Sequence, residues 1–290
     1  MNWRTWLKLG RVSNLPTVWS NGLAGWALSG SSLSGPALSG AALEAGALAL
    51  LLFALSLFYV AGMYLNDAFD AEIDARERAE RPIPTGEAGR GTVFALGFIM
   101  LTIGAIIAFG LGIGAGLAGL ALAGTIVLYD WLHKRTALSP VIMGACRMLT
   151  YVTAAFAAGG LTGALWIGAA GLFCHVVGLT YAAKQEAYDR IGAAWPLAVM
   201  AVPVVIGATM LAGAVAMLLL AAYVIWSGWA LSMLFRRRPG DVPRAVVSLI
   251  AAVSLYDAVM IAGTGNAWLA LLAVAAFGGT LALQRVVPGT

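Results

Sequence analysis

The chain has 290 residues, of which 61% are hydrophobic and only 10% are charged, and its mean hydropathy is +0.89. Because an ordinary soluble domain is about 25% charged, this composition excludes a water-soluble globular protein and a disordered chain. The net charge of +4 reflects loop orientation in a membrane protein, so no nucleic-acid partner is expected. We therefore predict one polytopic membrane domain over residues 1–290.

Ten apolar segments follow one another along the chain, each about long enough to cross a bilayer. In chain order they are 12–30, 42–65, 92–109, 113–130, 139–159, 162–182, 194–212, 215–235, 243–262 and 267–284. Lipid leaves no water to hydrogen-bond bare backbone groups, so these segments are expected to be helices. The predicted fold class is all-α, a polytopic transmembrane helical bundle of nine to ten spans.

All but one of the 17 basic residues gather on one side of this arrangement. They lie in the N-terminal stretch, in the C-terminal tail, and in the loops after the second, fourth, sixth and eighth segments. Positive charge marks cytoplasmic loops, so these loops and both termini are predicted to be cytoplasmic. The location that we expect is a bacterial inner membrane.

The first segment opens with Asn14, and Asn21 follows seven residues later on the same helical face. These two amides either line a cavity or hydrogen-bond between helices.

The second segment ends in the acidic motif Asn66-Asp67-x-x-Asp70-x-x-x-Asp74. On a continuing helix, the three carboxylates lie within about 60° of one another and repel. A cation between them relieves that repulsion, and oxygen ligands without histidine or cysteine favour Mg²⁺, which completes its shell with water and substrate phosphates. The motif therefore indicates a magnesium–diphosphate site. The alternative is a solvated acidic loop.

The motif is followed by Arg81-Pro82-Ile83-Pro84-Thr85-Gly86, which combines fixed-φ residues with a glycine turn. The loop after the fourth segment contains Lys134 and Arg135, which are suited to binding phosphate oxygens. The alternative for the proline-containing loop is a simple connector between two segments. The alternative for the loop with Lys134 and Arg135 is a positively charged cytoplasmic anchor. His133 is interpreted as a loop residue.

Arg147 lies inside the fifth segment, where a charge is costly unless it faces a cavity or a partner. It either lines a substrate cavity or pairs with Asp257 of the ninth segment. Tyr151 is one helical turn further on and is expected to share its face.

The sixth segment ends with a second polar cluster on the same side, Lys184-Gln185-Glu186 followed by Asp189. Glu186 and Asp189 can share a helix face and hold a second cation against one diphosphate. The alternative is a salt bridge between Glu186 and Arg190.

Together, the Asn66–Asp74 motif, the Arg81–Gly86 loop and the second acidic cluster resemble the UbiA superfamily of membrane prenyltransferases, in particular its 4-hydroxybenzoate polyprenyltransferase-like members. The resemblance covers essentially the whole chain. It implies nine spans around a central cavity and Mg²⁺-dependent prenyl transfer from a polyprenyl diphosphate to a small acceptor in the bilayer. Many relatives carry Asp-x-x-x-Asp in the second cluster. In this chain either Gln185 stands at the first position, or the register is Lys184-x-Glu186-x-x-Asp189, which resembles some chlorophyll-synthase-like members.

The resemblance also implies roles for individual residues. The expected metal ligands are Asn66, Asp67, Asp70, Asp74, Gln185, Glu186 and Asp189. The residues expected to be catalytic are Asp67, Asp70, Asp74, Lys134 and Arg147. The residues expected to bind diphosphate or acceptor are Asn14, Asn66, Arg81, Lys134, Arg135, Arg147, Tyr151 and Lys184.

The acceptor is the most open of these expectations. An aromatic acid or quinone precursor suits Arg147 as a carboxylate partner. A tetrapyrrole, a sugar or a glycerol phosphate is the alternative acceptor, and a transporter or a scaffold is the alternative to an enzyme. The oligomeric state cannot be read from the sequence.

Overall fold

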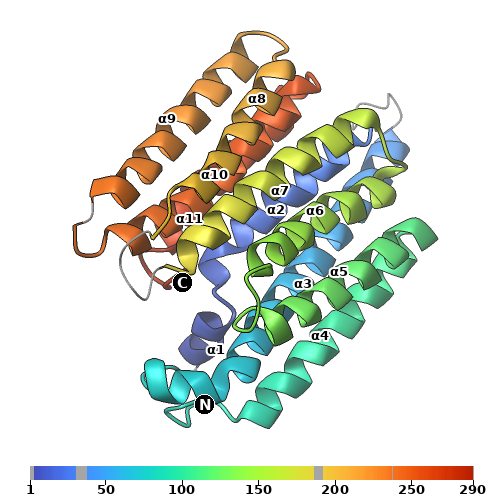
Figure 1. The fold of residues 1–290 in the computed structure, drawn as a ribbon. Coiled ribbons are helices and arrows are strands. Elements are labelled where there is room, and N and C mark those ends of the chain that lie inside the picture. The colour runs from blue at the N-terminus through green and yellow to red at the C-terminus, as the bar shows by residue number, and fades with distance from the viewer. Residues whose placement is uncertain (1–2, 31–37, 186–191, 237, 290) are drawn as a thin grey trace.

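The computed structural model describes residues 3–30, 38–185, 192–236 and 238–289, with only the backbone at 38–42. Throughout this part of the chain, the regular secondary structure is helical (Figure 1). The helices are α1 (Trp3–Leu9), η1 (Val12–Asn14), α2 (Leu15–Leu28), α3 (Leu38–Glu77), α4 (Arg90–Gly110), α5 (Ile113–Leu132), α6 (Ser139–Ala158), α7 (Gly163–Ala183), η3 (Trp195–Ala201), α8 (Val202–Thr209), α9 (Ala214–Arg236), α10 (Asp241–Gly263) and α11 (Ala267–Leu283).

Every predicted apolar segment coincides with one or two of these helices, and the all-α membrane fold is confirmed. Among the described residues, seven helices are long and apolar enough to cross a membrane, namely α3 to α7, α9 and α10. The other three segments are shorter. The first corresponds to η1 and the 14 residues of α2, the seventh to η3 and α8 together, and the tenth to the 17 residues of α11.

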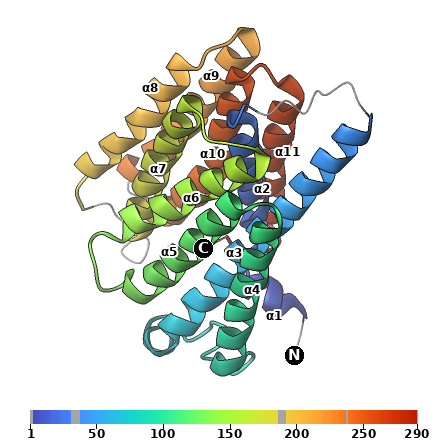
Figure 2. The same cartoon turned by 90° about the vertical axis from the view of Figure 1, so that its right-hand side faces the viewer.

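Helix α10 lies at the centre of the bundle, in contact with α2, α7, α9 and α11 (Figures 1 and 2). In its most apolar window, 89% of the residues are buried inside the protein, compared with 22% for α9. The exposed apolar side chains of α9 are therefore left to contact lipid. Helix α2 packs against α6, α10 and α11, so both α2 and α10 are largely enclosed.

The crossing of α2 and α6 depends on Gly25. A Cβ atom at Gly25 would lie 2.6 Å from the backbone oxygen of Tyr151 and 2.8 Å from the Cβ of Ala154. Only a glycine permits this approach of two backbones, as in other closely packed membrane helices. The close approach brings the polar residues of α2 against α6.

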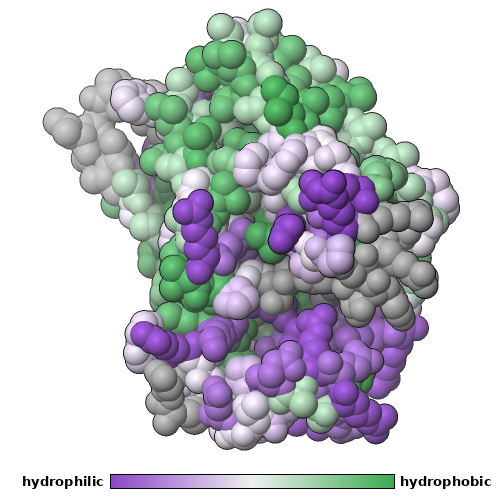
Figure 3. Space-filling view, turned by 90° about the vertical axis from the view of Figure 1, so that its left-hand side faces the viewer, coloured by the Kyte–Doolittle hydropathy of each residue, from purple (hydrophilic) through white to green (hydrophobic). Residues whose placement is uncertain are grey.

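Helix α3 carries the acidic motif out of the bilayer. At about 1.5 Å per residue its 40 residues extend about 60 Å, roughly twice the thickness of the hydrocarbon core. The last turns, which hold the motif, are therefore at or beyond the membrane surface. Figure 3 shows a face whose upper part is hydrophobic and whose lower part is rich in hydrophilic residues.

Candidate active site

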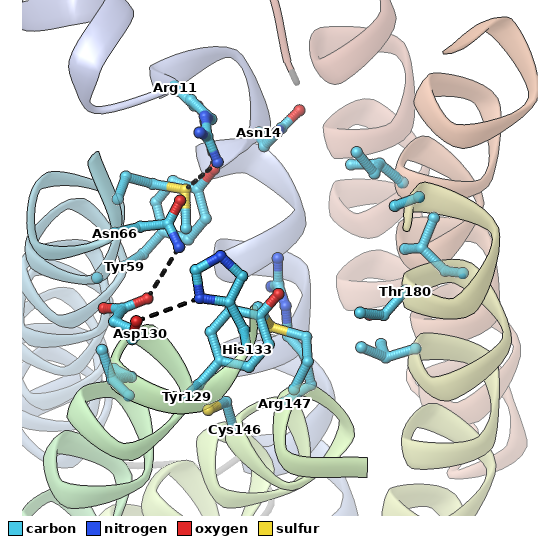
Figure 4. A pocket seen from close by; sticks show the side chains of 18 of the residues that line it. Arg11, Asn14, Tyr59, Asn66, Tyr129, Asp130, His133, Cys146, Arg147 and Thr180 are labelled. Carbon is cyan, nitrogen blue, oxygen red and sulfur yellow. Dashed lines mark hydrogen bonds between the residues drawn. The ribbon is translucent and has the colours of Figure 1, made fainter. Parts of the chain in front are cut away.

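A cavity of about 420 Å³ lies between α2, α3, α5, α6, α7 and α10 (Figure 4). Its polar lining includes Arg11, Asn14, Asn66, Asp70, Glu77, Arg81, Asp130, His133, Lys134, Arg147 and Lys184. Its apolar lining includes Val18, Leu55, Phe58, Leu122, Ile126, Val176, Leu179 and Val253. One cavity thus combines oxygen ligands and basic groups with an apolar wall.

Two side chains of the acidic motif line the cavity, and the other two lie beside it. Asn66 and Asp70 line the cavity, and both side chains are largely buried. Asp67 and Asp74 are also buried, but they are absent from the lining and are held by two arginines that line the cavity. Asp67 accepts from Arg81 at 3.1 Å, and Asp74 accepts from the same Arg81 nitrogen at 2.8 Å. The repulsion expected along this helix face is therefore relieved in part by the protein's own cations.

Arg11 is the second arginine on Asp67, with 3.0 Å between Nη2 and the carboxylate. It is the one non-glycine residue of the described chain with a positive φ, 41°. Such left-handed backbone costs about 1–3 kcal/mol and persists where other contacts enforce it. Here the Tyr59 hydroxyl donates to the Arg11 carbonyl. Burial lowers the pKa of Arg11, but the charge of Asp67 and its neighbours outweighs this and raises it above the ordinary value.

Arg81 is held in place by the turn that begins with it. The Thr85 hydroxyl donates to the carbonyl oxygens of Arg81 and Pro82, and the Ala88 amide also donates to Pro82. Gly86 supplies the left-handed φ of 79° that closes the turn. The proline-rich loop thus folds back on itself and keeps Arg81 against the end of α3.

The end of α5 supplies partners for Asp70. His133 Nε2 lies 3.1 Å from Asp70 Oδ2, and its Nδ1 lies 3.2 Å from the carbonyl oxygen of Asp130. Lys134 Nζ is 3.8 Å from Asp70 and 3.9 Å from Glu77. His133 is therefore not only a residue of the turn after α5, since it contacts the acidic motif directly.

Arg147 lines the cavity and belongs to a buried polar network. Its Nη1 donates to Asn21 Oδ1 at 2.7 Å, and its Nη2 donates to Thr17 at 3.2 Å. The other end of the Asn21 amide donates to Asp257 at 2.8 Å. Arg147 and Asp257 are thus linked through Asn21. The guanidinium carbon also lies 5.8 Å from the ring centre of Tyr59, within cation–π range.

Two further residues predicted to bind substrate lie elsewhere than in the cavity lining. Tyr151 is fully buried and donates to Asp257 at 2.7 Å. Arg135 is exposed, with its guanidinium carbon 6.0 Å from the ring centre of Trp131. The structure therefore brings Arg147 to the cavity without Tyr151, and Lys134 without Arg135.

Asn14 joins the cavity to the C-terminal tail. Its Nδ2 donates to the carbonyl oxygen of Gly289 at 2.8 Å, and its Oδ1 accepts from Gln284 at 3.0 Å. Asn14 and Gly289 both line the cavity. The last described residues of the chain therefore form part of its wall.

Of the second polar cluster, Lys184 reaches the cavity. It donates to Ser139 at 2.9 Å and to the carbonyl oxygen of Thr136 at 3.0 Å. Burial and the nearby Lys134 lower the pKa of Lys184. Gln185 lies in the turn after α7, outside the cavity lining, and Glu186 and Asp189 lie outside the described residues.

The donor set at this cavity fits a divalent cation that is shared with a phosphate. Within the described chain, no three histidine, cysteine or acidic side chains are close enough to hold a metal alone. Mg²⁺, however, commonly takes only one or two carboxylates and completes its shell with water and substrate phosphates. Asn66 and Asp70 present oxygen atoms of the required kind, and the buried Asp130 beside them has one oxygen without a hydrogen-bond partner among the residues that the structure describes.

The structure adds three residues to this site for which the sequence alone predicts no binding or catalytic role, namely Arg11, Tyr59 and Asp130. Arg11 is three residues before Asn14, and Asp130 ends an apolar segment. A charged residue at the border of an apolar segment was therefore the available signal for Arg11 and Asp130, whereas Tyr59 lies inside an apolar segment and gives no such signal. Their partners lie far away in sequence, so the pairings require the tertiary structure.

Comparison with known proteins gives matches in both sequence and structure. The sequence profile of the UbiA prenyltransferase family matches residues 23–235. A digeranylgeranylglyceryl phosphate synthase from Methanothermobacter thermautotrophicus is 32% identical over 109 residues, which are 37% of this chain and 39% of the relative. Another from Pyrococcus horikoshii is 42% identical over 74 residues, 26% of this chain and 27% of the relative. The matched stretches span less than half the length of either curated relative.

Solved structures show the same fold over nearly the whole chain. A UbiA homolog from Aeropyrum pernix K1 has a TM-score of 0.67 at 20% identity and covers 85% of this chain and 97% of its own. A UbiA homolog from Archaeoglobus fulgidus, bound to GPP and Mg²⁺, has a TM-score of 0.59 at 12% identity and covers 90% and 99%. A structure from work on digeranylgeranylglyceryl phosphate synthase in membranes has a TM-score of 0.63 at 18% identity and covers 90% and 97%.

Proposed function

Because this chain belongs to the UbiA prenyltransferase family, whose members are membrane enzymes that transfer prenyl groups, we propose that it joins the prenyl group of a polyprenyl diphosphate to the hydroxyl group of a glycerol phosphate acceptor. Curated relatives are named digeranylgeranylglyceryl phosphate synthase, and this name favours a glycerol phosphate acceptor over the aromatic or quinone-precursor acceptor expected from the sequence.

The observation that carries the proposal is the two-part lining of the cavity. Its polar part holds Asn66, Asp70 and basic side chains from several elements, as a diphosphate and its counter-ion require. Its apolar part, with Phe58 and Leu122, suits a prenyl chain. A neighbour of the same fold binds GPP and Mg²⁺, which supports a prenyl diphosphate and a divalent cation as ligands here.

In this mechanism, Asn66 and Asp70 would hold Mg²⁺, which would supply neutralisation of the negative charge on the leaving diphosphate. Lys134 donates to the diphosphate oxygens and holds them in place as the allylic carbon–oxygen bond breaks. Asp67 and Asp74 act through the arginines that they fix, Arg11 and Arg81, which complete the positive surroundings of the leaving group.

The cationic prenyl fragment is protected by the apolar wall. Phe58 and its aliphatic neighbours exclude water, which would otherwise capture the fragment. The face of the Tyr59 ring stabilises positive charge. The acceptor hydroxyl oxygen then forms the new carbon–oxygen bond, and its proton leaves with the diphosphate.

The acceptor phosphate binds Arg147 and Lys184. Asn21 and Thr17 occupy two donor groups of the Arg147 guanidinium, and the remaining donors are available to a phosphate in the cavity. Lys184 lines the same cavity from the end of α7. Neither residue is needed for the Mg²⁺ site at Asn66 and Asp70. Both can therefore bind the phosphate of the acceptor, which is a separate anion from the diphosphate of the prenyl donor.

The direct test is transfer by the purified protein in nanodiscs. Allylic diphosphates of several chain lengths are combined with Mg²⁺ and either a prenylated glycerol phosphate or 4-hydroxybenzoate. We expect a new ether lipid only with the glycerol phosphate, and loss of all product after chelation with EDTA. Product formation with 4-hydroxybenzoate as the acceptor, and none with the glycerol phosphate, would overturn the acceptor assignment.

An aromatic acid remains the second candidate acceptor. It is favoured by the position of Arg147 beside the Tyr59 ring, because an arginine and an aromatic face together suit a benzoate. The same assay separates the two acceptors.

A further inference from the structure

Asp130 is the buried acidic residue of the cavity wall for which the proposed mechanism has no role. It lies in the last turn of α5, and only 4% of its surface is exposed. Its Oδ1 accepts a hydrogen bond from Asn66 Nδ2 at 3.2 Å (Figure 4). Its Oδ2 is buried and has no hydrogen-bond partner among the described residues. Asn66 is thus the one side chain of the described chain that donates to this carboxylate.

Such an arrangement is costly as a purely structural contact. A buried carboxylate with one donor is poorly compensated, and an apolar side chain of similar size would join α3 to α5 at less cost. Asp130 also places a third carboxyl group near those of Asp67 and Asp70. The basic side chains nearby contact those two instead, since Arg11 and Arg81 bind Asp67 and His133 binds Asp70.

The contact has one clear effect on Asn66, which concerns the two ends of its amide. The Nδ2 end can only donate hydrogen bonds, and the Oδ1 end alone can bind a cation. In the structure the Nδ2 end donates to Asp130 Oδ1, so this contact engages the Nδ2 end. The Oδ1 end is thereby turned away from α5. A hydrogen bond from a metal-binding side chain to a neighbouring residue commonly fixes the orientation of that side chain. Loss of such a hydrogen bond costs about 10–100-fold in metal affinity.

We propose that Asp130 is a positioning residue that fixes the Asn66 amide with its oxygen available to the Mg²⁺–diphosphate complex. The proposal rests on the proposed function, because it assigns a purpose to Asn66 in that reaction. It predicts that the pair Asn66–Asp130 acts as a unit. Exchanging the two residues should preserve the arrangement. The amide, now at position 130 on α5, donates to one oxygen of the carboxylate, now at position 66 on α3. The other carboxylate oxygen stays free for the cation.

The test compares Mg²⁺ binding in the wild type, in Asp130→Leu, and in the exchanged variant Asn66→Asp/Asp130→Asn. The full-length protein is titrated with MgCl₂ in the presence of inorganic pyrophosphate, and the rise of the thermal unfolding midpoint reports binding. The Mg²⁺ concentration for half-maximal prenyl transfer is measured in parallel. We expect Asp130→Leu to need about 10-fold more Mg²⁺ or higher, and the exchanged variant to return near the wild-type value.

Asp241→Asn is the matched control. Asp241 is also a buried carboxylate near a helix end, but it pairs with Arg236 and lies outside the cavity lining. We expect this variant to lower the unfolding midpoint without changing the Mg²⁺ requirement. It therefore separates loss of stability from loss of metal binding.

An unchanged Mg²⁺ requirement in Asp130→Leu overturns the inference, even where that variant is less stable. An exchanged variant that folds but binds Mg²⁺ no better than Asp130→Leu also overturns it. Both results leave the proposed function intact. A wild type that shows no response to Mg²⁺ in either measurement overturns the proposed function and this inference together.

Discussion

At the residue scale, Arg81 holds two carboxylates of the acidic motif with one nitrogen, 3.1 Å from Asp67 and 2.8 Å from Asp74. Asp70 differs from both, because it lines the cavity and contacts His133. Residues with the same chemistry, a few positions apart on one helix, therefore have different surroundings. This difference has consequences that substitution can measure.

We predict that Asp70→Asn reduces Mg²⁺-dependent transfer by about 100-fold or more, because it removes a charged oxygen ligand from the cavity. Asp74→Asn should reduce it by about 10-fold, because it acts only through Arg81. Initial rates at saturating Mg²⁺ measure both effects. Equal losses in the two variants would contradict the different roles assigned to Asp70, which lines the cavity, and Asp74, which holds Arg81.

The same residues show how far a sequence predicts a site. The spacing of Asn66, Asp67, Asp70 and Asp74 predicts a shared helix face, and α3 does continue through the motif to Glu77. The spacing does not predict that Arg11 lies on Asp67, because that contact joins residues 56 positions apart. Nor does it predict the contact of His133 with Asp70, since a histidine in a loop has no periodic signal. The residue types are local information, whereas their pairing is a property of the fold.

At the element scale, the approach of α2 to α6 determines the position of the Arg147 network. Thr17 and Asn21 come from α2, and Arg147 comes from α6, so their hydrogen bonds require the close crossing at Gly25. The ten apolar segments were predictable because hydropathy alone marks them. The crossing was not, because a glycine in a helical segment has many roles and its neighbour cannot be read from the sequence.

We predict that Gly25→Ala lowers the free energy of unfolding by about 1–3 kcal/mol, because the new Cβ meets backbone atoms that cannot rotate away. Transfer should fall as well, since the separation of α2 and α6 moves Arg147. The thermal unfolding midpoint and the initial rate measure these effects. Gly124→Ala on α5 is the control: a Cβ atom there meets nothing within 4 Å, so the rate should be unchanged and stability should be equal or slightly higher, since alanine favours a helix over glycine.

At the scale of the whole molecule, charge is concentrated toward one end of the bundle. All but one of the 17 basic residues lie in the termini and in alternate loops, and the acidic motif is on the same side. This pattern predicts that the cavity opens toward the cytoplasm. The hydropathy of the surface in Figure 3 accords with a bundle that has one polar end.

Labelling of single cysteines tests this orientation. In intact cells, a membrane-impermeant maleimide should label Leu161→Cys, in the loop between α6 and α7, and should spare Ala79→Cys, in the loop after α3. Inverted vesicles should reverse the result. The wild type is the control, because Cys146 is buried and Cys174 half-buried. Labelling of Ala79→Cys in intact cells would contradict a cytoplasmic cavity.

The contact between Asn14 and Gly289 has a practical consequence for work on this protein. Because Gly289 forms part of the cavity wall, a small environment-sensitive dye attached at Gly289→Cys sits at the edge of the cavity. Its fluorescence would report when a ligand fills the cavity.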